Sequence, residues 1–213
     1  MPVRPDLQLR HRRRQDATRA RILGAARELV EEYPWRAVSI DVVARRAGLT
    51  RSAFTEHFAD RRELLLALLE EVGAHLQLLA LPWMTSSAAD GPAALRRVLA
   101  DLADAYVADG RLMRALADEA TQDADLGRLY ASLGAQIADD VAVRIRRDIT
   151  AGRSAVADPA AVATALVWLN ERFLIRRFGH RPLGDPAEAA AALAEIWLGA
   201  LYGTTRGSGS VGP

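Results

Sequence analysis

The sequence predicts an all-α protein of about nine helices, in which a small N-terminal three-helix domain precedes a larger helical body. Three observations predict this class. Apolar residues recur at helical spacing through most of the 213 residues, and no stretch alternates as a strand does. Residues that end helices, such as Pro34, Gly48, Gly179 and Gly203, fall between the periodic segments. The distribution of charge divides the chain near residue 62.

Charge is uneven along the chain. Residues 1–62 contain 14 Arg and 8 acidic residues, which gives a net charge of +6. Residues 63–213 contain 14 Arg and 19 acidic residues, which gives −5, so the overall charge of +1 conceals a basic front and an acidic body. A basic segment of this kind indicates contact with nucleic acid, because phosphates attract cationic side chains.

Four regions follow from these patterns. We expect residues 1–15 to be a disordered basic arm, whose run RHRRR at 10–14 is a solvated tail or contacts phosphates without reading sequence. Residues 16–62 form a domain of three helices, and residues 63–203 form the helical body. Residues 204–213 are rich in Gly and Ser and are expected to be a disordered tail.

The first helix is predicted over residues 16–32. It is ended by Pro34, because the residue before a proline avoids the helical conformation. Its apolar residues repeat at helical spacing and form one buried face: Ile22, Ala25, Ala26, Leu29 and Val30.

Residues 39–63 predict a helix-turn-helix. Ser39 caps a short helix, and Gly48 permits the positive φ of a tight turn. Thr50 caps the next helix, in which Phe54 and Phe58 face inward. In the short helix that Ser39 caps, the inward positions are Ile40, Val43, Ala44 and Ala47. A second helix presented in this way is the element that enters the major groove of DNA.

The second short helix leaves Arg51, Ser52, Thr55 and Glu56 outward. Arginine and hydroxyl groups at the start of such a helix suit both base edges and phosphate oxygens. The alternative is a plain helical hairpin with a solvated polar face, and the basic charge of this region favours DNA over it. Asp60 is predicted to cap a further helix whose first turn contains two arginines. Cations there oppose the helix dipole, so the two arginines indicate that a phosphate lies nearby.

The segment from Ile22 to about Leu69 resembles the DNA-binding domain of the TetR/AcrR family of repressors. The resemblance implies phosphate contacts from four residues: Ser39, Thr50, His57 and Arg61. It places Arg51 and Ser52 against bases. Thr55 stands where the family usually has Tyr, so a shorter hydroxyl replaces a phenol, and Arg61 replaces the usual Lys. The motifs that carry the resemblance are Ala47-Gly48-Leu49-Thr50, Thr55-Glu56-His57-Phe58 and Ala59-Asp60-Arg61.

The body is predicted to contain six helices. The first continues from the helix-turn-helix and ends before a loop that includes Pro82 and residues 86–92. Asp158-Pro159 and Asp185-Pro186 each place a cap before a proline at the first helical position. The predicted ranges are 60–79, 92–107, 110–119, 124–151, 159–178 and 186–202, the last two ended by Gly179 and Gly203.

The last two helices carry more apolar surface than one buried stripe each. We therefore predict a homodimer in which residues 159–178 and 186–202 of each subunit form a four-helix bundle. The segments ALVWLNER at 165–172 and IWLGALYG at 196–203 resemble the last two helices of EthR-like repressors within the same family. That resemblance implies the same interface and a long apolar ligand tunnel in the body.

A binding site for a small hydrophobic effector is predicted within the body. Apolar stripes surrounding one amide are typical of small-molecule sites, but leucines at this spacing are more often a filled core, and residues alone favour the core. The resemblance to EthR-like repressors reverses this preference for Asn170 and Trp197. The candidate ligand-binding residues are Leu95, Leu99, Leu102, Tyr106, Tyr130, Leu133, Ile137, Trp168, Asn170, Phe173 and Trp197.

Several classes of protein are disfavoured. The four His residues are scattered, and the acid pairs Glu70-Glu71 and Asp139-Asp140 diverge on a helix. No nucleophile, phosphate-loop or metal motif is present, and there is no Cys, so we expect no enzyme, no cofactor and no metal site. No apolar run approaches transmembrane length and no signal-peptide core is present, which predicts a cytoplasmic protein without a membrane partner.

The expected function is transcriptional repression. A dimer would place two recognition helices about 34 Å apart, or a multiple of that, on one face of a palindromic double-stranded operator. A small hydrophobic effector in the body would then favour a different spacing and release the DNA. The alternative is a helical adaptor that binds protein and has no sequence-specific recognition of DNA.

Overall fold

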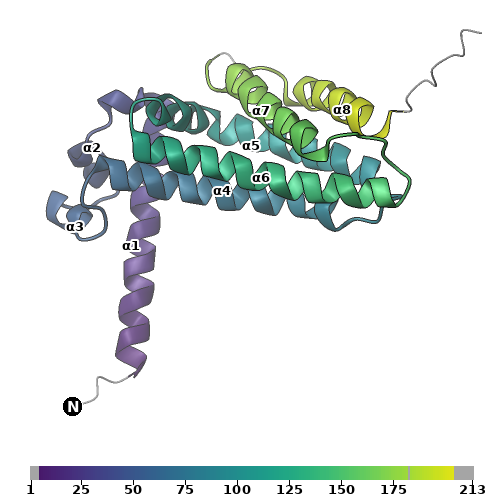
Figure 1. The fold of residues 1–213 in the computed structure, drawn as a ribbon. Helices are drawn as coiled ribbons and strands as arrows, with labels where there is room; N and C mark the ends of the chain where they lie inside the picture. The colour runs from purple at the N-terminus through teal and green to yellow at the C-terminus, as the bar shows by residue number, and fades with distance from the viewer. Residues whose placement is uncertain (1–4, 182, 204–213) are drawn as a thin grey trace, which may run out of the picture.

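The computed structural model describes residues 5–181 and 183–203, and this part of the chain is helical without strands. Figure 1 shows a small head of short helices at one end of an elongated helical body. Eight α-helices and one 3-10 turn make up the fold: α1 Pro5–Glu32, η1 Trp35–Ala37, α2 Ile40–Arg46, α3 Arg51–Thr55, α4 Arg61–Thr85, α5 Gly91–Ala120, α6 Ala124–Thr150, α7 Pro159–Phe178 and α8 Pro186–Tyr202.

The head is built around the C-terminal half of α1. The predicted buried face of this helix is confirmed, since Ile22, Ala26 and Leu29 are almost fully inaccessible to solvent. They pack with Phe54 and Phe58, whose ring centroids lie 5.8 Å apart. This core fixes α2 and α3 against α1 and the start of α4.

Helix α1 is longer than predicted. The expectation of disorder over residues 1–15 is wrong for residues 5–15, which continue the helix back to Pro5, whereas residues 1–4 lie outside the described part. The physical reason is local, because residues 6–23 contain no Gly or Pro and are rich in Arg, Leu, Gln and Ala, which are strong helix formers. Figure 1 shows this N-terminal half projecting away from the body.

The body packs three long helices, α4 to α6, with α7 and α8 across one side of them (Figure 1). Helix α8 packs chiefly on α5, and α7 packs on α6 and α5. The predicted caps are confirmed: Asp158 accepts hydrogen bonds from the N–H groups of Ala160 and Ala161, and Asp185 accepts one from Ala187. The predicted tail, 204–213, lies outside the described residues.

Two predicted breaks in the body are wrong. The helices expected over 92–107 and 110–119 are one continuous α5. A Cβ on Gly110 would lie 2.7 Å from the backbone of Phe178, so the absence of a side chain allows the end of α7 to pack closely against α5. This packing keeps α5 helical through Gly110. Helix α4 also continues past the predicted end at residue 79 and through Pro82 to Thr85. Pro82 and Leu78 are both exposed, so the carbonyl that loses its hydrogen bond faces solvent.

Helix α4 is more apolar than the sequence pattern suggested. An 18-residue window within Arg61–Thr85 has a mean hydropathy of 1.6, so by length and composition this helix alone among the described residues could cross a membrane. The expectation that no apolar run approaches that length is therefore wrong. In the fold, α4 packs against α5 and α6, and Leu65, Leu68 and Val72 lie in the core. These contacts are those of a core helix.

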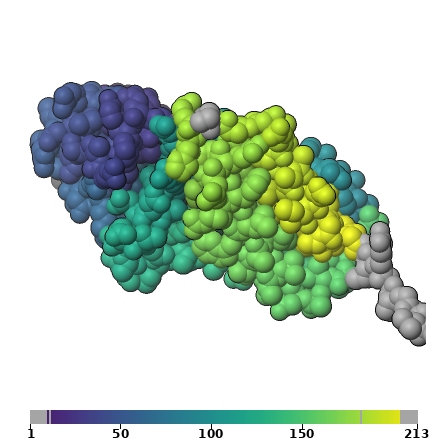
Figure 2. Space-filling view, turned by 90° about the horizontal axis from the view of Figure 1, so that it is seen from above, coloured from purple at the N-terminus to yellow at the C-terminus, as the bar shows by residue number. Residues whose placement is uncertain are grey.

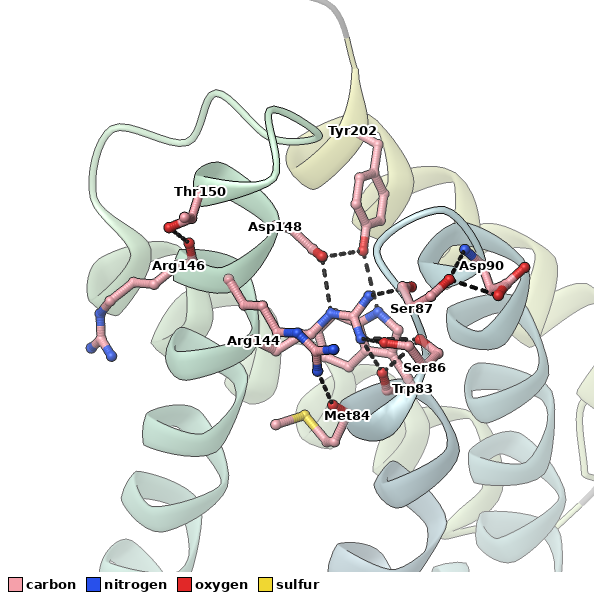
Figure 3. A network of polar contacts seen from close by, with 11 residues as sticks. Trp83, Met84, Ser86, Ser87, Asp90, Arg144, Arg146, Asp148, Thr150 and Tyr202 are labelled. Carbon is pink, nitrogen blue, oxygen red and sulfur yellow. Dashed lines mark hydrogen bonds and ion pairs between the residues drawn. The ribbon is translucent and has the colours of Figure 1, made fainter.

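A buried ion pair closes the end of the body far from the head. Arg144 and Asp148, one turn apart on α6, are both about 1% exposed, and Arg144 Nε donates to Asp148 Oδ2 at 3.0 Å. The Arg144 guanidinium also donates to the carbonyl oxygens of Trp83, Ser86 and Ser87, where α4 ends (Figure 3).

Helix α8 joins the same network through its last residue. Tyr202 Oη donates to Asp148 Oδ2 at 2.7 Å and accepts a hydrogen bond from Trp83 Nε1 at 3.2 Å (Figure 3). The Trp83 ring packs edge-on against Trp197, with centroids 5.8 Å apart. The network therefore holds the ends of α4, α6 and α8 together and positions both tryptophans toward the interior of the body.

Candidate functional site

The turn between α2 and α3 has the geometry that the sequence predicts. Ser39 Oγ accepts a hydrogen bond from Val42 N at 3.4 Å, and Thr50 Oγ1 accepts one from Ala53 N at 3.1 Å. Gly48 has φ of 66°, a conformation that other residues rarely adopt. These caps and this turn set the angle between two helices that are each too short to be stable alone.

The exposed side of α3 presents the predicted base-contacting group. Arg51, Ser52 and Thr55 are all exposed. Arg51 pairs with Asp41 at 2.9 Å, and because both side chains are more than half exposed, the pair contributes little to stability. The Thr55 hydroxyl donates to the Ser52 carbonyl at 2.9 Å, an internal bond that keeps it close to α3.

The residues for which the resemblance implies phosphate contacts differ in their exposure and in their hydrogen bonds. Ser39 and Thr50 are exposed, with their hydroxyls in the two caps, and His57 is half-buried after α3. Arg61 turns toward the head: its Nη1 donates to the carbonyl oxygens of η1 and the residue that follows it, at 3.2–3.3 Å. Its guanidinium also lies over the Trp35 ring, 5.3 Å from the centroid. Arg61 therefore fixes the start of α4, and only its other N–H groups are left for a phosphate.

A second candidate site is an apolar cavity of about 120 Å³ inside the body. It is walled by α4, α5, α6, α7 and α8. The structure brings ten of the eleven predicted ligand-binding residues together around it: Leu95, Leu99, Leu102, Tyr106, Tyr130, Leu133, Ile137, Trp168, Asn170 and Trp197.

Phe173 is the predicted residue that does not line the cavity; it is half-buried and packs against the core elsewhere. At about 100° per residue, the lining positions of α7 from Val167 to Glu171 cover a face of roughly 160°. Phe173 lies about 60° beyond the edge of that face on the side of Asn170. The periodicity of α7 contains this information, but it becomes usable only when the facing helices are known.

Sequence reasoning missed the wall that α4 provides. None of its residues is among the predicted ligand-binding residues, yet half a dozen of them line the cavity: Leu69, Val72, Leu76, Leu79, Ala80 and Trp83. Glu171 was also missed, and it is the one acidic side chain among the described lining residues. Its signal in the sequence is a carboxylate next to Asn170, directly after the mostly apolar stretch 159–169.

The cavity is long and narrow. Its lining on α6 extends from Tyr130 to Val141, which spans about 16 Å at the helical rise. On α4 it extends from Leu69 to Trp83, about 21 Å. A volume of 120 Å³ spread over that length admits a slender chain rather than a bulky ring system.

Two polar groups interrupt the apolar lining. Trp197 Nε1 donates to Asn170 Oδ1 at 2.8 Å, which leaves the Asn170 amide nitrogen as a donor. Tyr130 Oη donates to Glu171 Oε1 at 2.7 Å. Burial, with the neighbouring Glu171 carboxylate as a further cause, raises the pKa of both Tyr106 and Tyr130, so both phenols stay protonated.

Comparison with family models assigns both parts of the chain. Residues 22–68 match the model described as bacterial regulatory proteins, tetR family. Residues 95–203 match the C-terminal domain of the transcriptional regulator EthR. The two matches cover the helix-turn-helix and most of the wall of the cavity.

Curated relatives agree with these matches. The chain is 25% identical to the HTH-type transcriptional regulator EthR of Mycolicibacterium smegmatis over 191 residues, which is 89% of this chain and 88% of that protein. It is 26% identical to EthR of Mycobacterium tuberculosis over 189 residues, 87% of each chain. These relatives are transcriptional regulators and not enzymes.

Solved structures show the same fold. A TetR-family transcriptional regulator from Pectobacterium atrosepticum superimposes with a TM-score of 0.65 at 25% identity, covering 89% of this chain and 97% of that one. SmeT, the repressor of the Stenotrophomonas maltophilia multidrug efflux pump SmeDEF, gives a TM-score of 0.67 at 22% identity, covering 86% and 90%. The all-α architecture with an N-terminal helix-turn-helix and a C-terminal helical domain is thereby confirmed.

Proposed function

Because the chain belongs to the TetR family of bacterial regulatory proteins, we propose that it is a repressor that a ligand releases from DNA. As a homodimer it binds a palindromic double-stranded operator, and a small hydrophobic effector in the cavity of the body weakens that binding. One observation supports this above the others: α4 is shared by the head and the cavity. Arg61 at its start holds η1, and Trp83 near its end lines the cavity.

The head supplies the contacts with DNA. The exposed start of α3 enters the major groove, where Arg51 and Ser52 meet base edges. Ser39, Thr50, His57 and Arg61 contact the flanking phosphates, and Thr55 lies beside the same groove. Arg51 exchanges its bond with Asp41 for one with a base, because an exposed ion pair contributes little in free protein.

Substitution of two arginines separates base contacts from phosphate contacts. Arg51→Ala is expected to weaken binding to the selected operator by about 1–3 kcal/mol and to relax its sequence preference. Arg61→Ala is expected to weaken operator and unrelated duplex similarly and to flatten the dependence on salt. Fluorescence anisotropy with both duplexes over a range of salt concentrations measures each effect.

The matched control is Arg153→Ala, which removes an exposed arginine from the loop after α6. Its affinity for both duplexes should stay within twofold of the parent chain. Equal loss of operator binding in all three variants would mean that net charge alone binds DNA, and the proposed roles of Arg51 and Arg61 would be rejected.

The dimer forms through α7 and α8. The two helices lie side by side on one face of the body (Figure 2). Trp168 on α7 and Ile196 on α8 are 38% and 45% exposed, so this face presents large apolar side chains that a partner could cover. The outer face of α8 also has four small residues, Ala191, Ala192, Gly199 and Ala200, which allow two helices to approach closely, beside the exposed carboxylates of Glu188 and Glu195.

Ile196→Glu tests this interface. A charge buried at the centre of a four-helix bundle is expected to convert the dimer to a monomer at micromolar concentration, measured by sedimentation velocity. Leu78→Glu is the control, because Leu78 is 62% exposed on α4, away from both helices, and its variant should remain dimeric. A parent chain that is already monomeric at that concentration would contradict the proposal directly.

Effector binding acts through α4. An apolar occupant displaces side chains of α4 that line the cavity, and the helix transmits that shift to the head. A coupling of about 1–3 kcal/mol between the two sites is enough to change operator occupancy severalfold or more. The free Asn170 amide nitrogen orients an acceptor group on the effector. If saturation of the cavity leaves operator affinity unchanged, release by this route is refuted.

The alternative of an adaptor that binds only protein has no comparable support. It explains neither the exposed Arg51 and Ser52 at the start of α3 nor the match of residues 22–68 to a DNA-binding model. We place the repressor in the cytoplasm, where its operator is, and propose no membrane partner.

A further inference from the structure

One carboxylate oxygen in the cavity lacks a hydrogen-bond donor. Glu171 Oε1 accepts the Tyr130 hydroxyl, but Oε2 is buried and is reached by no donor among the described residues. Its ion-pair contact within the described residues is from the same Oε2 to Arg172 Nε at 4.0 Å, which is beyond hydrogen-bond distance, and the Arg172 side chain is 70% exposed. Buried polar atoms without partners are rare in folded proteins, so Oε2 requires an explanation.

The surroundings of Glu171 are aromatic. Tyr130 and Trp168 lie with ring centroids 6.5 Å apart, and Tyr106 is buried in the same lining. The faces of such rings attract cations. Because burial keeps both phenols protonated, neither tyrosine carries a negative charge. The carboxylate therefore supplies the charge, and the rings supply a polarisable wall beside it.

The rest of the described lining has no charge to balance Glu171. It contains no Arg and no His, and its other polar groups, such as the Asn170 amide and the Tyr106 and Tyr130 phenols, are neutral. An acidic ligand would face a like charge in a medium of low dielectric constant, which is strongly unfavourable. A cation would satisfy Oε2 and neutralise the site.

The position of Glu171 along the cavity determines which end of a bound molecule would lie nearest the head. Its partner Tyr130 lies near the start of α6, where Arg62 at the start of α4 pairs with Asp123 at 2.5 Å. Glu171 is thus toward the end of the cavity nearest the head. Trp83 is at the other end, and Trp197 lies between them, where its Nε1 donates to Asn170 and its ring packs against Trp83. A charged group at Glu171 leaves about 16 Å of narrow apolar space for a chain.

We propose that this end of the cavity is a subsite for a cationic amine, and that the effector is a slender lipophilic ammonium ion. The inference rests on the proposed function, because it names the chemical class of the effector. The ammonium group donates to Glu171 Oε2 and lies against the rings of Tyr130 and Trp168. Its chain runs past Asn170 and Trp197 toward Trp83.

Calorimetric titration of the full chain at pH 7 with two probes of equal chain length, n-octylamine and 1-octanol, tests the subsite. The amine is expected to bind at least about tenfold more tightly, because only it can donate a charged hydrogen bond to Oε2. Glu171→Gln should remove this difference, since an amide of the same shape carries no charge. Quenching of the tryptophans that line the cavity gives a second readout of binding.

The control is Glu70→Gln, which neutralises an exposed carboxylate on α4 outside the cavity and should retain the preference for the amine. Equal affinity of the parent chain for both probes, binding of neither probe, or a preference that survives Glu171→Gln would overturn the proposal. If Glu171→Gln fails to fold, the comparison of the two probes on the parent chain still decides it. Amine that binds tightly without releasing operator would refute the proposed function and leave the subsite intact.

Discussion

Replacing Arg144 with alanine is expected to destabilise the chain by about 3–5 kcal/mol. The substitution leaves the Asp148 carboxylate buried without a cation, and it removes the donors that hold the carbonyl oxygens at the end of α4. Tyr202 still donates to Asp148 Oδ2, but Oδ1 lacks a donor among the described residues, so no cation there replaces Arg144. The midpoint of urea unfolding, measured at fixed protein concentration, should fall accordingly.

Arg146→Ala is the matched control for this prediction. Arg146 lies on the same helix, two residues away, and it is exposed (Figure 3). Its removal should change the free energy of unfolding by less than about 0.5 kcal/mol. An Arg144→Ala variant as stable as the Arg146→Ala variant would show that the buried pair does not hold the end of the body together.

Phe54→Ala is expected to lower affinity for the operator by at least about 100-fold, because α3 depends on this ring for its position. Phe54 is fully buried, and it is the buried residue of a helix of five residues, which is too short to persist without tertiary packing. Loss of the ring leaves a cavity beneath Arg51 and Ser52 and lowers the free energy of unfolding by about 3–5 kcal/mol. Anisotropy with labelled operator, below the unfolding temperature of the variant, measures the loss.

Phe178→Ala distinguishes the loss of the position of α3 from a general loss of stability of the chain. Phe178 is equally buried but lies at the end of α7 in the body, so its removal should lower the unfolding temperature to a similar extent. Its effect on operator affinity should be much smaller than that of Phe54→Ala. If both variants lose operator binding equally, general destabilisation explains the effect and the argument for α3 fails.

Features encoded by neighbouring residues could be predicted from the sequence. Ser39, Thr50 and Asp60 each accept a hydrogen bond from a backbone N–H three residues later, as their residue types and positions indicated. Gly48 adopts the positive φ that the turn required. Such caps and turns depend on a few adjacent residues, so one sequence is enough to identify them.

Features that depend on distant partners could not be predicted. Gly110 does not interrupt α5, because the end of α7 packs against it, and that contact joins residues 68 positions apart. Glu171 was not recognised as part of the cavity, because its partner Tyr130 lies 41 residues earlier. The wall formed by α4 was not predicted, since leucines at helical spacing look the same in a filled core and beside a cavity.

The cavity residues could be predicted only in part from the sequence. Helical periodicity on α5 and α6 placed Leu95, Leu99, Tyr130 and Leu133 on inward faces, and the structure brings them to one cavity. Periodicity does not reveal whether facing stripes touch or leave a space. For that reason Phe173, which is inward on its own helix, lies outside the lining.

The central claim is that α3 in the basic head reads a specific duplex. Duplexes selected from a random pool by the purified chain, tested in competition with bulk DNA at moderate salt, measure this most directly. The account predicts a palindromic selected sequence bound at least about a thousandfold more tightly than the competitor. A chain that shows no preference for any duplex over bulk DNA would contradict it.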